Sequence, residues 1–220
     1  MVTPLTAQAQ WRVLLVDDHP LTRHGLAQLI AQQPDLVVCA EAGSAEDALK
    51  SVRGHQPNLV LVDVILPGKP GLELIKDLTT MFPEVAVLVF SMHDESLYAE
   101  RALRAGARGY VMKSVGGEEM LKAIRHVLAG KVYLSQELSA RILDSLSGNV
   151  RRPAGVLSVL SDREFEVFQL VGEGLPTREI GLRLHISGKT VETHRLSIRE
   201  KLGLKNPAEL TKYAIRWAGA

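Results

Sequence analysis

The chain has 220 residues, of which 46% are hydrophobic and 23% are charged, a composition typical of a globular protein and not of a disordered or fibrous one. No run approaches the roughly 20 uncharged apolar residues that cross a bilayer. The first ten residues also lack the basic start and apolar stretch of a signal peptide. We therefore expect a cytoplasmic protein of about two domains that makes no contact with the membrane. A lone cysteine, Cys39, excludes an intramolecular disulfide.

The net charge of +1 hides a difference between the two ends of the chain. Residues 1–150 hold 14 Lys and Arg against 17 Asp and Glu, whereas residues 151–220 hold 12 against 8. A small basic domain beside a larger acidic one fits nucleic-acid binding by the basic part. Because the excess charge is small, only sequence motifs can show whether the basic part binds nucleic acid.

Short apolar runs rich in Val and Leu recur through the first half of the chain and predict five buried strands. They occur at residues 13–16, 36–40, 59–62, 85–90 and 109–112. The segments between them have the apolar spacing of helices, for example Leu121, Ile124 and Leu128. Strands that alternate with helices form a parallel sheet covered on both faces. Residues 11–130 are thus predicted to form a doubly wound α/β domain around a five-stranded parallel sheet.

The alternation ends after Gly130. Residues 131–157 are predicted to be a linker that contains one further helix, marked by Leu138, Ile142 and Leu146. Residues 158–220 are predicted to form an all-α domain of four helices. These helices are expected at residues 161–171, 177–184, from 187 to about 202, and 207–217. Ser161 followed by Glu164 is a capping box, and Gly203 suits a left-handed helix end.

Polar residues follow four of the predicted strands, where open parallel sheets bind their ligands. Asp17 and Asp18 come after the first strand, Asp63 after the third, Ser91 ends the fourth and Lys113 follows the fifth. Three converging carboxylates repel one another unless a cation is bound or their pKa values rise. A small set of oxygen ligands favours Mg²⁺. Such a site can transfer a phosphoryl group onto a carboxylate, with the metal and the lysine neutralising the developing charge.

The ordered set of motifs VDDHP, VDVILPG, VFSMHDE and GYVMKS resembles the receiver domain of response regulators, which has a flavodoxin-like fold. The resemblance covers nearly all of residues 11–130. It implies phosphorylation of the chain by a cognate histidine kinase. The resemblance implies that Asp63 is the phosphoacceptor and that Lys113 contacts the phosphoryl group. It implies that Mg²⁺ is bound by Asp63, by Asp17 or Asp18, and by the Ile65 carbonyl. It also implies that Ser91 and Tyr110 are switch residues.

The third helix of the second domain carries an apolar residue, Leu196, on the face opposite its core positions. A large apolar side chain in that place can meet a thymine methyl group in the major groove, and Glu192 can accept a hydrogen bond from cytosine. Thr193 can contact a base or a phosphate. The further residues placed to reach phosphates are Lys189, Arg195 and Arg199, together with the backbone at Thr177 and Arg178.

The segment from LSDREFEVF to REKLGL resembles the LuxR-type helix-turn-helix over its whole length. A receiver with this output domain is similar to the NarL/FixJ class of regulators, in which the third helix enters the major groove and the last helix often dimerises. The dimer residues implied by the resemblance are Leu210, Tyr213, Ala214 and Trp217, although packing within the domain also explains Leu210 and Ala214. Gly181 stands where the family usually has Ala, which should weaken the second helix slightly.

The sequence thus predicts a transcription factor in which phosphorylation of Asp63 switches homodimerisation and binding to paired half-sites of double-stranded DNA. It is not expected to be an enzyme beyond its own phosphorylation and dephosphorylation. Ile65 and Met92 flank the site and cannot activate a water molecule, so a long-lived phosphoryl group is expected unless His93 assists. Two alternatives remain: an enzyme of the aspartyl-phosphate type that acts on an external phosphoester, and a binding module independent of phosphorylation.

Overall fold

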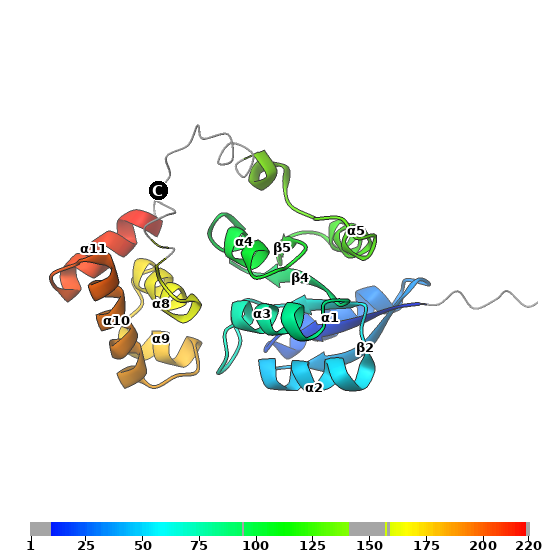
Figure 1. Cartoon of the computed structure of the whole chain (residues 1–220), viewed down its shortest axis with the longest axis horizontal. Helices are drawn as coiled ribbons and strands as arrows, with labels where there is room; N and C mark the ends of the chain where they lie inside the picture. The colour runs from blue at the N-terminus through cyan, green and yellow to red at the C-terminus, as the bar shows by residue number, and fades with distance from the viewer. Residues whose placement is uncertain (1–9, 94, 141–156, 158, 219–220) are drawn as a thin grey trace, which may run out of the picture. The chain divides into compact units, whose positions relative to one another are not determined.

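The computed structural model describes residues 10–93, 95–140, 157 and 159–218. The chain divides into two compact units, residues 1–140 and residues 141–220. Each unit is described by itself, and the helices of both units and several of the strands are labelled in Figure 1. Within the described residues, no helix combines the length and the apolar character needed to cross a membrane.

The first unit alternates strands and helices, as the apolar runs predict. Its strands are β1 (Trp11–Val16), β2 (Leu36–Ala42), β3 (Leu59–Val62), β4 (Ala86–Ser91) and β5 (Tyr110–Met112). Its helices are α1 (Pro20–Ala31), α2 (Ala45–His55), α3 (Gly71–Met81), α4 (Glu95–Arg104) and α5 (Gly117–Leu128). The strand positions agree with the predicted ones to within about two residues.

The five strands form one parallel sheet in the order β2-β1-β3-β4-β5. The order reverses beside β1, so the carboxyl ends of β1 and β3 form the crevice in which such sheets bind ligands. Helices α1 and α5 cover one face through a core that includes Leu26, Ile30 and Ile124, and α2, α3 and α4 lie together on the other face. The predicted doubly wound fold is confirmed.

A glycine lets α3 begin directly against the end of β3. A Cβ added at Gly71 would lie 2.1 Å from the carbonyl oxygen of Asp63 and 2.8 Å from that of Val64. The Gly71 N-H instead donates to the Val64 oxygen at 2.9 Å. This contact fixes the loop that follows Asp63, and any larger residue would push the loop away from the strand end.

The segment 131–140, which the sequence assigns to the linker, belongs to the first unit. Tyr133 forms a parallel β-bridge with Gly109, next to the edge strand β5. Residues 136–140 are helical, which agrees with the start of the predicted linker helix. Ile142, Leu146 and the rest of the predicted linker up to residue 156 lie outside the described residues.

The second unit contains α8 (Asp162–Gly172), α9 (Thr177–Arg183), α10 (Gly188–Leu202) and α11 (Pro207–Ala218). Ser161 and Glu164 form the predicted capping box at the start of α8. Ser187 caps α10, and Gly203 ends it with a left-handed φ of 66°. Helices α8, α9, α10 and α11 pack against one another as the four-helix prediction requires.

The carboxylate of Glu164 also joins α8 to α10. It accepts hydrogen bonds from Lys201 Nζ at 2.6 Å and from Ser197 Oγ at 2.6 Å. Although burial opposes the charged form, the contacts with Lys201 and Ser197 lower the pKa of Glu164 to about 2. One side chain thus serves the helix cap and the packing of α10.

Candidate phosphoacceptor site and nucleic-acid interface

The register of the sheet brings two aspartates together. Val62 of β3 pairs with Val16 of β1, and the residues that follow them are Asp63 and Asp17. Their exposed fractions are only 5% and 3%. The two carboxylates therefore lie side by side in a largely buried site at the carboxyl end of the sheet.

Lys113 supplies the positive charge of this site. Its Nζ lies 2.5 Å from Asp17 Oδ2 and 2.5 Å from Asp63 Oδ2, and its side chain is buried as deeply as theirs. Burial raises the pKa of the Asp63 carboxyl, against the opposing effect of the Lys113 ammonium. Burial alone would lower the pKa of Lys113, but the carboxylates of Asp63 and Asp17 raise it above 10.5.

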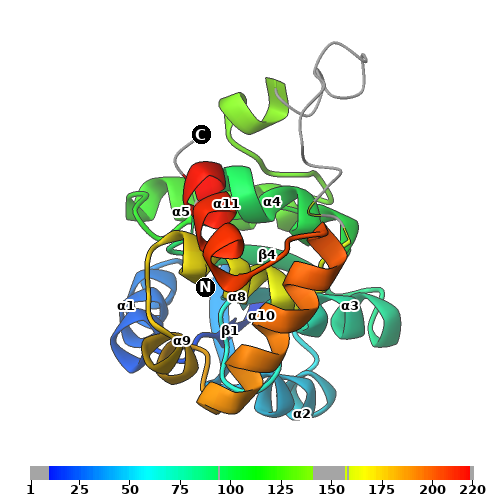
Figure 2. The ribbon, with the colours of Figure 1, turned by 90° about the vertical axis from the view of Figure 1, so that its left-hand side faces the viewer.

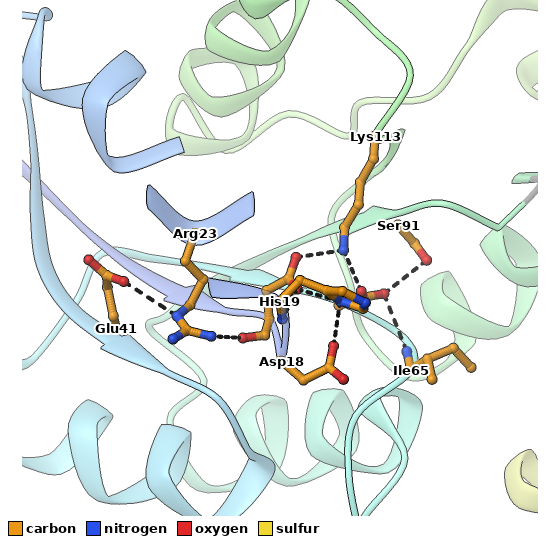
Figure 3. Close-up of polar contacts among 9 residues, drawn as sticks. Asp18, His19, Arg23, Glu41, Ile65, Ser91 and Lys113 are labelled. Carbon is orange, nitrogen blue, oxygen red and sulfur yellow. Dashed lines mark hydrogen bonds and ion pairs between the residues drawn. The ribbon is translucent and has the colours of Figure 1, made fainter. Parts of the chain in front are cut away.

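Asp18 and His19 complete a group of possible metal ligands with Asp17 and Asp63. One ligand atom from each of the four residues lies within 4.8 Å of the others, and His19 Nδ1 is 2.7 Å from Asp18 Oδ1 (Figure 3). Three carboxylates face the single ammonium of Lys113, so the residues present fit a divalent cation that prefers oxygen. His19 is a site residue that the sequence analysis missed, although it is part of the VDDHP motif.

Arg23 of α1 fixes the loop that carries these aspartates. Its Nη1 donates to the Asp17 carbonyl oxygen at 2.5 Å, and its Nε donates to Glu41 of β2 at 3.3 Å (Figure 3). The guanidinium thus ties the end of β1 to β2 and orients the peptide between the two aspartates. Sequence reasoning could not find this residue because the contact depends on the packing of α1 against β2.

Of the predicted switch residues, Ser91 contacts Asp63 directly and Tyr110 contacts His93. Ser91 is fully buried, and its hydroxyl donates to Asp63 Oδ1 at 3.0 Å. The ring of Tyr110 is buried, and its hydroxyl donates to the His93 carbonyl oxygen at 2.9 Å. The Ile65 N-H lies 3.3 Å from Asp63 Oδ1 and donates to it. The structure brings these residues together, and their roles in switching remain predictions.

The exposed face of α10, the helix labelled in Figure 2, carries most of the predicted DNA contacts. Lys189, Glu192 and Thr193 are exposed, and Leu196 keeps 49% of its surface exposed. Val191 and Ile198, on the opposite face, are fully buried. The helix therefore presents an apolar side chain among polar ones to solvent, as the sequence predicts, and such a face fits a DNA groove.

Three of the predicted contacts are linked to one another. Thr177 Oγ1 at the start of α9 donates to Glu192 Oε1 at 2.5 Å, and Arg195 Nη1 donates to the same hydroxyl at 3.3 Å. Arg199 donates to the Lys205 carbonyl at 3.4 Å. Glu192 must therefore exchange the Thr177 hydroxyl for a base if it reads cytosine. Arg178 of the predicted set is exposed at the same end of α9.

Two of the predicted dimer residues lie in the interior. Leu210 and Ala214 have no exposed surface, so they are core residues in this structure and not part of a dimer surface. Tyr213 and Trp217 are half-buried, with ring centroids 6.0 Å and 5.6 Å from that of Phe168 in α8. Packing between α8 and α11 uses the same helical spacing as an interface, so Leu210 and Ala214 follow the packing alternative, and a dimer role for Tyr213 and Trp217 stays a prediction.

The fold and the acidic site define a receiver domain, and the second unit defines a helix-turn-helix domain. Residues 13–125 match the family model of the response regulator receiver domain, and residues 158–214 match that of bacterial regulatory proteins of the luxR family. The chain is 33% identical to the oxygen regulatory protein NreC of Staphylococcus aureus (strain MRSA252) over 210 residues, which cover 93% of this chain and 97% of NreC.

Solved structures give the same result. A LuxR-family two-component response regulator from Aurantimonas sp. SI85-9A1 is 36% identical, with a TM-score of 0.59 over 63% of this chain and 99% of that one. RcsB of Salmonella enterica serovar Typhimurium, bound to promoter rprA with the phosphomimetic BeF₃⁻, is 25% identical, with a TM-score of 0.62 over 93% and 98%. The chain belongs to the two-component response regulators with a luxR-type DNA-binding domain.

Proposed function

We propose that a histidine kinase phosphorylates Asp63 and that the phosphoryl group switches dimerisation and DNA binding. The observation that supports this best is the position of Asp63, buried between the Lys113 ammonium and the Ser91 hydroxyl. A carboxylate oxygen of Asp63 attacks the phosphorus of a phosphohistidine, the P-N bond breaks, and the imidazole leaves with the bond's electron pair. Lys113 then contacts the phosphoryl oxygens, and Ser91 donates to one of them.

The residues that would hold Mg²⁺ are Asp17, Asp18 and Asp63, with the Ile65 carbonyl as a further ligand. Their support is the surplus of carboxylates over ammonium groups and the short distances among the ligand atoms. When bound, the ion neutralises charge that develops on the transferring group. Asp17 keeps its contact with Lys113, and Arg23 holds the peptide that carries Asp17 and Asp18.

We propose that α10 enters the major groove of double-stranded DNA. Leu196 contacts a thymine methyl, Glu192 and Thr193 contact bases, and Lys189 and Arg195 neutralise phosphates. The RcsB structure with a promoter and a phosphomimetic supports both the DNA partner and the link to phosphorylation. A homodimer would bind two half-sites, because joining the domains raises the local concentration of the second one. This function places the protein in the cytoplasm.

Two properties distinguish this proposal from the alternatives. A stand-alone enzyme acting on a phosphoester would leave the second unit without a role, whereas a binding module independent of phosphorylation would not need the buried set of Asp17, Asp63 and Lys113. We further propose that the phosphoryl group persists. Neither Ile65 nor Met92 can deprotonate water, and the imidazole of His93 packs against the ring of Tyr98, with the two centroids 5.2 Å apart.

The test is to incubate the full chain with acetyl phosphate and Mg²⁺ and to measure the intact mass. We expect one phosphoryl group on the wild type and none on Asp63→Asn, with a lifetime well beyond seconds. Asp47→Asn, a change at a surface carboxylate on α2, is the control and should label like the wild type. Labelling of Asp63→Asn would contradict the assignment. Loss of the label within seconds, unchanged in Ile65→Asn, would contradict the long lifetime.

A further inference from the structure

The segment that leaves the receiver, residues 131–140, is fastened across one edge of the domain, and we name it the exit strap. The Tyr133 N-H donates to the Arg108 oxygen at 2.9 Å, and the Tyr110 N-H donates to the Tyr133 oxygen at 3.1 Å. A Cβ added at Gly109 would lie 2.7 Å from that Tyr133 oxygen. Only glycine lets the exit strap approach the sheet edge this closely.

Side chains of the exit strap reach two helices of the receiver. The Tyr133 hydroxyl donates to Glu119 of α5, and the Ser135 hydroxyl donates to Glu95 of α4. Ser135 Oγ also accepts from the Leu138 N-H at 3.1 Å, as a residue that caps a helix does. Ser135 therefore joins the start of the helical residues 136–140 to the first turn of α4.

A path of hydrogen bonds, joined through His93 and Tyr110, leads from the phosphoacceptor to the exit strap. The Ser91 hydroxyl donates to Asp63 and accepts from the His93 N-H at 3.4 Å. The Tyr110 hydroxyl donates to the His93 oxygen at 2.9 Å, and the Tyr110 N-H donates to the Tyr133 oxygen. Glu95, the other anchor of the exit strap, lies four residues beyond Ser91.

We propose that the exit strap is a latch, closed in the unphosphorylated receiver and released by phosphorylation, and this rests on the proposed function. A phosphoryl group on Asp63 draws the Ser91 hydroxyl away from its present partners. The turn at His93 and the start of α4 then move, so that both Tyr110 and Glu95 loosen their hold on the strap. Release frees the chain that leads to the DNA-binding domain. The strap is held by a few hydrogen bonds and by the packing of Tyr133 and Leu138, so the phosphoryl group releases it by favouring the state in which these contacts are broken.

Hydrogen exchange of the full chain tests the latch directly, because the Tyr133 amide is protected only while the strap is closed. We expect a peptide covering residues 129–140 to be protected with Mg²⁺ alone. With Mg²⁺ and beryllofluoride, its exchange should accelerate about tenfold. If residues 91–93 respond to beryllofluoride while the exit strap does not, the latch is wrong and the proposed switch stands. If neither responds, both are wrong.

Variants at Ser135 separate the latch from general loosening. Ser135→Asp keeps a capping oxygen but places a carboxylate against Glu95, so the strap should exchange about tenfold faster without beryllofluoride. Adding Glu95→Gln should restore slow exchange, because the amide of Gln donates to the new carboxylate. Ser139→Asp adds the same charge within the strap and should leave exchange unchanged. Equal acceleration by Ser135→Asp and Ser139→Asp, or failure of the double variant to restore protection, would overturn the latch.

Discussion

The Nζ of Lys113 lies 2.5 Å from an oxygen of Asp63, and both side chains are almost fully buried. The Lys113 ammonium contacts the same carboxylates that would bind a metal ion, and its positive charge repels the ion. We therefore expect Lys113→Met to bind Mg²⁺ about tenfold more tightly, because one repelling charge is removed. The same variant should lose its response to beryllofluoride, since the phosphoryl contact is gone. Isothermal titration calorimetry measures the affinity for Mg²⁺ and the response to beryllofluoride. Lys122→Met on the exposed face of α5 is the control. Weaker Mg²⁺ binding by Lys113→Met would contradict this role.

Arg23 should act on the metal site through the peptide of Asp17. Arg23→Lys keeps the charge but loses the planar guanidinium group, which donates to both the Asp17 carbonyl and Glu41. Groups that orient metal ligands typically contribute 10- to 100-fold to affinity, and we expect a loss of about tenfold for Mg²⁺. Arg53→Lys, on the exposed end of α2, should bind Mg²⁺ like the wild type. An unchanged Mg²⁺ affinity in Arg23→Lys would show that the loop after β1 keeps its conformation without the guanidinium group.

The charge of Glu164 should stabilise the second unit in a way that depends on pH. Its folded pKa of about 2 lies below the ordinary value of 4.5, so this stability is present above pH 4.5 and lost as the pH falls towards 2. Glu164→Gln keeps the capping box but loses the charged pair with Lys201. After allowance for solvent screening, we expect it to cost about 1 kcal/mol at pH 7, with the difference shrinking below pH 4.5.

Trp217 reports this unfolding, because its ring packs against Phe165 and Phe168. A Trp11→Phe background leaves it as the only tryptophan. The surface pair of Glu173 and Arg183 offers a control, and Glu173→Gln should change the stability by less than about 0.5 kcal/mol. A cost for Glu164→Gln that stays constant from pH 7 to pH 3 would mean that the charge is not responsible.

Two glycine substitutions within helices should act in opposite directions. A Cβ at Gly181 in α9 would lie 2.8 Å from the Ile186 carbonyl oxygen, so Gly181→Ala should destabilise the second unit by about 1 kcal/mol. No atom lies within 4 Å of a Cβ added at Gly25 in α1, so Gly25→Ala should stabilise the first unit by about 0.5 to 1 kcal/mol. Calorimetry of the full chain measures both transitions. A stabilising Gly181→Ala would instead support the expectation from helix propensity alone.

Substitutions on the exposed face of α10 should distinguish residues that contribute to DNA affinity from residues that contribute to sequence specificity. The specific duplex is first selected from a random library by the protein with Mg²⁺ and beryllofluoride. Lys189→Ala should then weaken binding to this duplex and to all others, and it should lower the slope of log affinity against log salt concentration by about 1. Leu196→Ala should cost about 1 kcal/mol on the selected duplex and little on others. Fluorescence anisotropy at several salt concentrations measures these effects. A uniform loss with Leu196→Ala would mean that this residue reads no base.

The sequence predicts the strands and the acidic site well, because both depend on local patterns. Runs such as residues 59–62 are apolar at every position, and the polar residue that follows each strand must lie at the same edge of a parallel sheet. The capping box at Ser161 is equally local. These features require no knowledge of how distant segments pack.

What the sequence does not reveal depends on tertiary contacts. The anchor of Arg23 requires α1 to lie against β2, and the exit strap is invisible until Tyr133 meets the edge of β5. The burial of Leu210 and Ala214 follows from packing on α8, which helical periodicity cannot distinguish from an interface. The tight approach at Gly181 depends on the turn at Ile186, so helix propensity alone predicts the opposite sign for the stability effect of Gly181→Ala.

In the proposed mechanism, the phosphorylation state of Asp63 controls the DNA-binding unit. The most direct test measures DNA binding and oligomeric state of the wild type and of Asp63→Ala, each with Mg²⁺, in the presence and absence of beryllofluoride. We predict that beryllofluoride converts the wild type to a dimer that binds the selected duplex more tightly and leaves Asp63→Ala unchanged. Identical binding by both proteins, insensitive to beryllofluoride, would contradict the switch and favour a DNA-binding module independent of phosphorylation.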